Sequence, residues 1–239
     1  MSFYADSHYP VRDDLAAVHA SQMGQLGAPG TWGTGPQRLT IAAAARKAGI
    51  DAGLLEDAAD GDTPDTSELP GIALRVVERL AVSPKDVDLA FYEAALKGGL
   101  TDAEFTEIVG LVARATNFDI FARGIGVPLR PLPSALPGEP TRERPGVAVT
   151  ELAWVPTIPN PPEGGDEAIA LYGPKPKPYI IRALSLVPAE LRAHLELEQV
   201  QYLPLNRILE YDFQHHEGLT RAQAEIVAGR VSALNECFY

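Results

Sequence analysis

The stretch that decides the fold lies at the end of the chain and reads Gly218-Leu-Thr-Arg-Ala-Gln-Ala-Glu-Ile-Val-Ala-Gly-Arg-Val-Ser-Ala-Leu-Asn-Glu-Cys-Phe-Tyr239. Thr220 and Gln223 have the spacing of a capping box, in which two side chains satisfy the free amides of a helix start. Apolar residues then recur at helical spacing, which predicts a helix with one buried face: Ala222, Ile226, Val227, Val231 and Leu234. Glu225 lies on this helix and the chain's one cysteine, Cys237, near its end. Because no terminating glycine or proline follows, we expect something outside this chain to complete the helix.

The rest of the chain repeats the same start and stop signals. Thr34, Ser83 and Thr101 are placed as N-caps, and Gly126 as a helix terminator. Together with the apolar periodicity, these signals predict helices over 13–26, 37–48, 69–80, 83–97, 107–125, 179–183 and 188–209. No stretch of four or more residues alternates between polar and apolar in the manner of a strand. The predicted fold class is therefore all-α, a bundle of helices.

Proline divides the chain into three segments. Thirteen of the 21 prolines fall between Pro128 and Pro178, where they exclude long helices and central strands. We therefore predict a helical unit over 1–129, a stiff and extended proline-rich linker over 130–178, and the front part of a second helical unit over 179–239. Trp154 is expected to dock the linker on one of the helical units. Residues 1–12 are predicted to form an arm, and the acidic stretch 56–68 a solvated loop.

Composition limits the classes of partner. A net charge of −12 opposes binding to nucleic acid or to an anionic membrane, since both are polyanions. No apolar run approaches the length of a membrane-spanning helix, and the N-terminus has no secretory signal. One cysteine excludes an intrachain disulfide and fits a reducing compartment. We expect a cytoplasmic protein.

Two predicted helices of the chain can be aligned in sequence with a gap of one residue. The alignment of 99–117 with 218–235 sets Thr101, Glu107 and Asn117 against Thr220, Glu225 and Asn235. In the first copy, Asp119 falls where Cys237 stands, so that copy has no thiol. Either the chain contains two copies of one helical unit, or two capped amphipathic helices are alike by chance.

The final stretch resembles the active-site helix of the carboxymuconolactone decarboxylase and alkylhydroperoxidase D superfamily. That helix has a Leu-Thr cap, a glutamate, a Cys-x-x-Cys motif and then a histidine. Glu225 and Cys237 match the glutamate and the first cysteine at the twelve-residue step of the motif, and the remaining two residues would fall beyond Tyr239. Residues 69–129 also look like the helices that follow the cysteine helix in such units, with 37–54 as a cysteine helix that has lost its cysteines. On this basis 1–129 is a degenerate unit.

The resemblance implies thiol redox chemistry. In the family a thiolate attacks a peroxide, the neighbouring cysteine resolves the sulfenic acid, and a glutamate–water–histidine relay moves the proton. It therefore names Cys237 and Glu225 as catalytic residues and a small peroxide as the substrate. In a continuous helix, however, about 18 Å of rise separates the two residues, so a direct contact needs a break near Asn235. Cys237 can also be a structural cysteine or the remnant of the family's first cysteine, and Glu225 can be a buried or partly buried acid that is paired within the bundle.

With one sulfur, we expect no peroxidase activity from residues 1–239 alone unless a second chain or segment completes the site. The competing hypothesis is a non-catalytic helical assembly or binding subunit, the partner in a homo- or hetero-oligomer. We expect a homo-oligomer. The superfamily's decarboxylase and lactone chemistry has no dedicated residues here.

Other candidate sites are weak. His215 and His216 beside Glu217 lack the helical spacing of metal ligands, so we expect a solvated turn and no metal site. His19 and His194 have no partner in the sequence. The glycines of 30–35 follow no strand and predict no phosphate loop, and no fingerprint for a cofactor is present.

Overall fold

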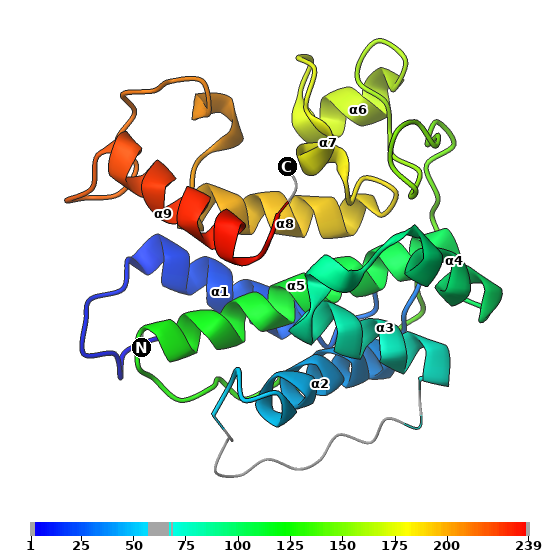
Figure 1. Cartoon of the computed structure of the whole chain (residues 1–239), viewed down its shortest axis with the longest axis horizontal. Coiled ribbons are helices and arrows are strands. Elements are labelled where there is room, and N and C mark those ends of the chain that lie inside the picture. The colour runs from blue at the N-terminus through cyan, green and yellow to red at the C-terminus, as the bar shows by residue number, and fades with distance from the viewer. Residues whose placement is uncertain (1–2, 57–66, 68, 238–239) are drawn as a thin grey trace.

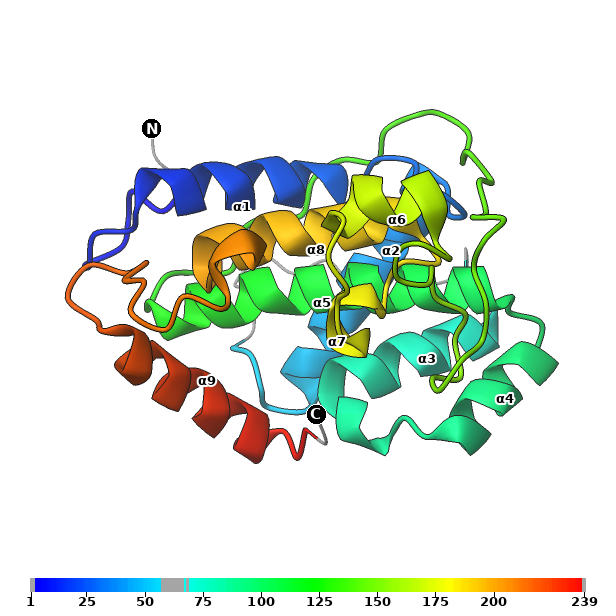
Figure 2. The same cartoon turned by 90° about the horizontal axis from the view of Figure 1, so that it is seen from above.

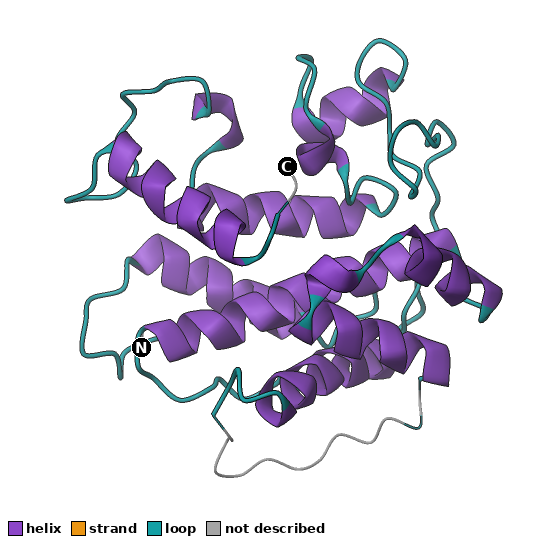
Figure 3. Ribbon diagram, in the orientation of Figure 1, coloured by secondary structure: helices purple, strands orange, loops and turns teal. Residues whose placement is uncertain are grey.

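The computed structural model describes residues 3–56, 67 and 69–237, and these residues form helices joined by turns and extended segments (Figures 1 and 3). Apart from an isolated antiparallel bridge between Val149 and Thr157, the described residues contain no β-structure. The all-α class is confirmed. The helices are α1 (Asp13–Gln25), α2 (Gly35–Asp51), α3 (Gly71–Val82), η1 (Pro84–Asp86), α4 (Leu89–Lys97), α5 (Asp102–Gly124), α6 (Gly165–Tyr172), α7 (Tyr179–Arg182), α8 (Pro188–Gln201), η2 (Leu205–Arg207) and α9 (Arg221–Leu234).

Local side-chain chemistry fixes the starts of three helices. Complete capping boxes begin α2, α5 and α9, formed by the pairs Thr34 with Gln37, Thr101 with Glu104 and Thr220 with Gln223. In each pair the threonine hydroxyl accepts from a backbone N–H of the first turn, and the glutamine or glutamate oxygen accepts from the threonine N–H. The predicted starts are thus confirmed at the level of individual hydrogen bonds.

Three predicted segments differ from the structure. Residues 83–97 form the short η1 and then α4, because Val87 is extended and Asp88 caps a new helix, its Oδ1 accepting from the Phe91 N–H at 2.8 Å. The predicted helix 188–209 ends as α8 at Gln201, shortly before Pro204, which has no amide hydrogen to continue it. The proline-rich segment is not extended throughout, since the proline-free stretch 163–173 contains α6.

The core lies on both sides of α5. Figure 2 shows α5 running between α1 and α3, and its contacts extend to α2, α3, α1 and α8. Leu111 and Phe118 of α5 are fully buried, together with Val76 and Val77 of α3. Leu197 of α8 belongs to the same cluster, so residues from the first and third predicted segments contact each other directly.

The arm and the linker both pack on the helices. The side chain of Tyr4 is buried, and its hydroxyl lies 2.7 Å from Nδ1 of His19 on α1. Trp154 stacks on Tyr92 of α4 with ring centroids 6.3 Å apart, so the predicted docking of the linker is confirmed. Most of the acidic stretch 56–68 lies outside the described residues.

Candidate functional site

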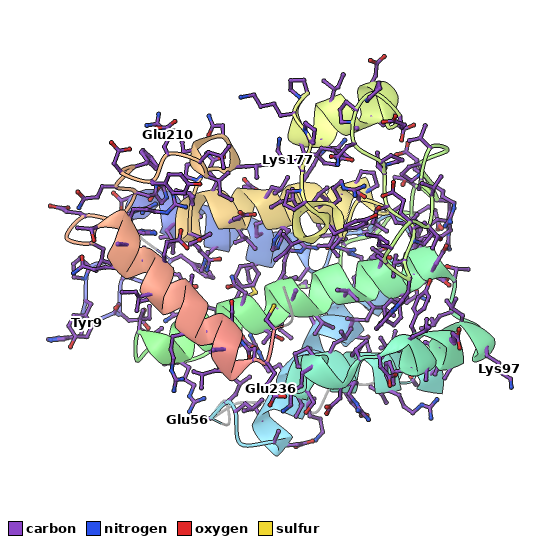
Figure 4. All side chains as sticks on the ribbon, turned by 45° about the horizontal axis from the view of Figure 1, so that its top comes forward. Tyr9, Glu56, Lys97, Lys177, Glu210 and Glu236 are labelled. Carbon is purple, nitrogen blue, oxygen red and sulfur yellow. The ribbon has the colours of Figure 1, made fainter. Side chains whose placement is uncertain are left out.

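The helix α9, which carries Glu225, is attached to the rest of the molecule through polar contacts. Figures 1 and 2 place it at the edge of the bundle. Arg221 donates from Nε to Glu225 at 2.5 Å and from Nη2 to the Ile208 carbonyl at 3.2 Å. The Tyr202 hydroxyl lies 2.8 Å from both carboxylate oxygens of Glu225. Just beyond the other end of α9, the Glu236 carboxylate (Figure 4) pairs with Lys85 at 2.5 Å.

The apolar face of α9 points outward, which contradicts the predicted buried face. No residue of α9 is buried. The exposed fractions of the four large apolar side chains range from 52% to 72%, at Val231, Val227, Leu234 and Ile226. The sequence period shows that one side of a helix is apolar, and it does not say whether another element covers that side. We call the residues 222, 223, 226, 227, 230, 231 and 234 the outward face of α9.

Cys237 lies beyond the end of α9 and is exposed. The helix stops at Leu234, Asn235 caps it, and Glu236 has a left-handed φ of 52°. The Cys237 N–H then donates to the Ser232 carbonyl at 2.9 Å. The predicted absence of an exit signal is therefore wrong, and the predicted break at Asn235 is present. The break does not join the two candidate catalytic residues, because Glu225 is bound by Tyr202 and Arg221 instead.

Glu225 is held as a carboxylate. Partial burial alone would raise its pKa, but the hydrogen bonds from Tyr202 and Arg221 and the charge of Arg221 outweigh burial and leave the pKa below its ordinary value. Burial and the bond to Glu225 raise the pKa of Tyr202 to about 12. At neutral pH Glu225 is thus a carboxylate, and both of its oxygens accept hydrogen bonds.

The two adjacent histidines lie under the start of α9. His216 Nδ1 lies 3.2 Å from Nη1 of Arg12, and its Nε2 lies 3.0 Å from the Tyr202 carbonyl. An arginine can only donate and a carbonyl can only accept, so His216 is the Nε2–H tautomer with both nitrogens occupied. In the part of the chain that the structure describes, no three histidine, cysteine, aspartate or glutamate residues are grouped as metal ligands would be.

The structure contains a buried charge cluster that the sequence did not indicate. It consists of Arg38 on α2, Glu107 and Arg114 on α5, and Glu190 in the first turn of α8, all buried. Arg38 Nη1 donates to Glu107 and, at 3.0 Å, to Glu190. Arg114 Nη2 donates to the two oxygens of Glu190 at 3.0 and 2.8 Å, and its Nη1 donates to Gln22 at 3.0 Å. The sequence offers one signal for this cluster, which is that charged residues occupy positions where the apolar period of a helix predicts a buried side chain. It does not show how they pair, because the four residues come from three different helices.

The aligned residues of α5 and α9 have different environments. Glu107 accepts from the Trp32 N–H at 2.5 Å, and burial raises its pKa although Arg38 acts in the opposite direction. Glu225, its counterpart in the alignment, is partly exposed and has a lowered pKa. Asp119, at the position of Cys237, is buried in a two-bond pair with Arg46 at 2.6 and 2.9 Å. The aligned positions of α5 thus both form internal ion pairs.

Comparisons with protein-family models, with curated proteins and with solved structures find no match to this chain. Among the helices of the described residues, none combines the length and the apolar character that crossing a membrane requires. Functional conclusions therefore rest on the residues themselves.

Proposed function

We propose that the chain is a helical assembly subunit that binds a second copy of itself through the outward face of α9. The observation that supports this proposal is the exposure of four large apolar side chains on one side of a helix, which is attached through its polar side. Contiguous apolar surface of this kind is typical of protein–protein contacts.

The composition of the outward face suits a second copy as the occupant. The chain has a net charge of −12, so two copies repel each other over most approaches. The outward face contains no carboxylate, and Arg230 is its one charged residue. A two-fold dimer brings the same patch of both subunits together, and an apolar stripe is complementary to itself. The outward face is thus where two copies meet with little charge repulsion and bury apolar surface.

Analytical ultracentrifugation over a range of protein concentrations tests this proposal. We expect a concentration-dependent dimer for the natural sequence and a monomer for Val231→Asp. Leu152→Asp is the matched control, because Leu152 is an exposed apolar residue of the proline-rich segment. A chain that remains monomeric at all concentrations, or a Val231→Asp variant that dimerises as the natural chain does, contradicts the proposal.

We also propose, as a second function, alkylhydroperoxidase-like thiol chemistry at Cys237, supported by the exposed free thiol beside the outward face. A thiolate attacks the peroxide and forms a sulfenic acid while the alcohol leaves. A second thiol then condenses with the sulfenic acid, forming a disulfide and releasing water, and a dithiol reductant restores both thiols. The second thiol comes from another chain, in the simplest case the Cys237 of a second copy. Such chemistry fits a reducing compartment, and we propose the cytoplasm.

Treatment of the reduced chain with hydrogen peroxide, after the thiol reductant has been removed, tests the second function, because dithiothreitol would itself react with the sulfenic acid and reduce a linked dimer. Under conditions where dimers form, the natural chain should consume hydrogen peroxide and form a disulfide-linked dimer that is visible on a non-reducing gel. Cys237→Ser should abolish both the consumption and the linked dimer. Equal consumption by the Cys237→Ser variant would defeat the assignment, and a dimer without consumption would leave assembly as the function.

A further inference from the structure

A cavity of about 250 Å³ lies against the buried charge cluster, where the first turns of α8 face the loop before α2. Arg38 and Arg114 form its buried wall, beside Glu190. The remaining walls are formed by Gln25, residues 28–31, Thr141 and the start of α8, with the exposed Arg192 and Glu143 at the rim. Sites for small molecules are usually cavities of roughly this size or larger, lined by apolar groups with a few converging polar ones.

The guanidinium groups of this wall are not fully used by the protein. All side-chain hydrogen bonds of Arg38 are made through Nη1, and its Nη2, which has no partner among the described residues, is not among the atoms sealed from solvent. Arg192 forms no ion pair or hydrogen bond with any described residue. Buried polar groups are nearly always hydrogen-bonded, so a wall with spare guanidinium donors is one that a ligand or ordered water can satisfy.

Two glycines make room for this arrangement. A Cβ on Gly30 would collide with Arg38 and Glu107, and a Cβ on Gly110 would fall 2.7 Å from the Glu190 side chain. The loop at Gly30 therefore runs directly over the ion pairs. Its neighbours Trp32 and Gly33 donate their backbone N–H groups to Glu107, which holds that carboxylate away from the cavity. Glu107 is not among the residues that line the cavity, so the guanidinium groups face it instead.

We propose that this cavity is a binding site for a small organic molecule with a carboxylate, which accepts hydrogen bonds from Arg38 and Arg192. A guanidinium presents its N–H groups in a planar fork that matches a carboxylate. The hydroxyls of Thr31 and Thr141 on the opposite wall suit the polar groups of the same ligand, and Ala189 and Ala193 contact its carbon atoms.

The charge of the ligand can be balanced by a proton. The two arginines and two glutamates of the cluster cancel, so a bound anion leaves one excess negative charge. Glu107 is the group that takes up the proton, because burial raises its pKa. The charge of Arg38 lowers this pKa, and the charge of Glu190 raises it further. The groups that face Glu107 are Arg38 from α2, Glu190 from α8 and the Trp32 and Gly33 amides. Carboxylate binding should accordingly strengthen as the pH is lowered.

Isothermal titration calorimetry of the full chain with acetate, succinate and benzoate, at constant chloride concentration, tests the site. We expect saturable binding of at least one of these carboxylates at one site per chain. Arg192→Glu should weaken it at least tenfold. Arg75→Glu is the matched control, because Arg75 is an exposed arginine of α3 that does not line the cavity. Arg38→Lys keeps the charge and loses the fork, and it should weaken binding.

Three results would overturn the proposal. One is the absence of saturable binding of all three probes to the natural chain. Another is equal weakening by Arg192→Glu and Arg75→Glu, which indicates general charge attraction rather than a site. The third is an inorganic phosphate titration that shows tighter binding than every carboxylate, since a tetrahedral anion would then be the ligand.

Discussion

Acidification should destabilise this protein through one buried histidine. The side chain of His19 is fully buried among the rings of Tyr4, Phe118 and Phe121, with centroid distances of 5.6, 5.2 and 4.8 Å. Its Nδ1 is bonded to the Tyr4 hydroxyl, and its Nε2 has no partner among the described residues. Burial lowers the pKa of His19 from 6.5 to about 4, because nothing in this apolar site solvates a second proton.

The sign and size of the effect follow from proton binding in the two states. Between pH 6.5 and about 4, the unfolded chain binds a proton at His19 and the folded chain does not, so the free energy of unfolding falls as the pH falls. At about 1.4 kcal/mol per pKa unit, the full difference is worth about 3 kcal/mol. That is a large fraction of the roughly 5–15 kcal/mol by which a folded domain is usually stable.

Urea unfolding at pH 7 and pH 4, followed by circular dichroism, measures this contribution. The natural chain should lose about 3 kcal/mol more than His19→Gln between the two pH values. His8→Gln, at an exposed histidine, should follow the natural chain. Carboxylates titrate equally in all three proteins, so the difference isolates His19. If the natural chain and His19→Gln lose the same free energy to within about 0.5 kcal/mol, the reasoning from burial is refuted.

Three further outcomes are expected. Glu190→Gln should lower the free energy of unfolding in urea by about 3–5 kcal/mol, because it leaves two buried guanidinium groups with one carboxylate. Glu151→Gln is the control, because Glu151 is more exposed in its pair with Arg182, and it should lower this free energy by less than about 1 kcal/mol. Ile226→Asp should leave the thermal melt of dilute protein nearly unchanged, and Leu111→Asp, in the core, should prevent folding. Cys237 should react with a thiol reagent as fast in buffer as in urea, and slow reaction of dilute monomer would contradict its exposure.

Local signals in the sequence predicted the helices well. A cap is decided by residues within one turn, so Thr34, Thr101 and Thr220 could be read directly, and each forms its capping box. The errors at Asp88 and Gln201 also have local causes, a second cap and an approaching proline. Both were visible in the sequence but competed with a continuing apolar period.

The buried charge cluster and the surroundings of α9 were harder to predict, because they depend on which helices contact each other. The partners of Arg38 lie 69 and 152 residues away along the chain, and no pattern within one helix specifies them. The apolar period of α9 was recognised, but its exposure was not, since burial depends on neighbours. Glu225 was assigned to Cys237 by a spacing and is bound instead by Tyr202, whose position only the tertiary fold provides.

The position of α8 has a consequence for synthesis on the ribosome. Glu190 supplies the carboxylate shared by Arg38 and Arg114, and Leu197 helps to close the core formed by α2, α3 and α5. A nascent chain that has reached only the proline-rich segment therefore presents two guanidinium groups and an apolar surface that have not yet met their partners. Because such surfaces aggregate, growing chains of this protein should depend on chaperones until about 200 residues have emerged, well after the first five helices can form.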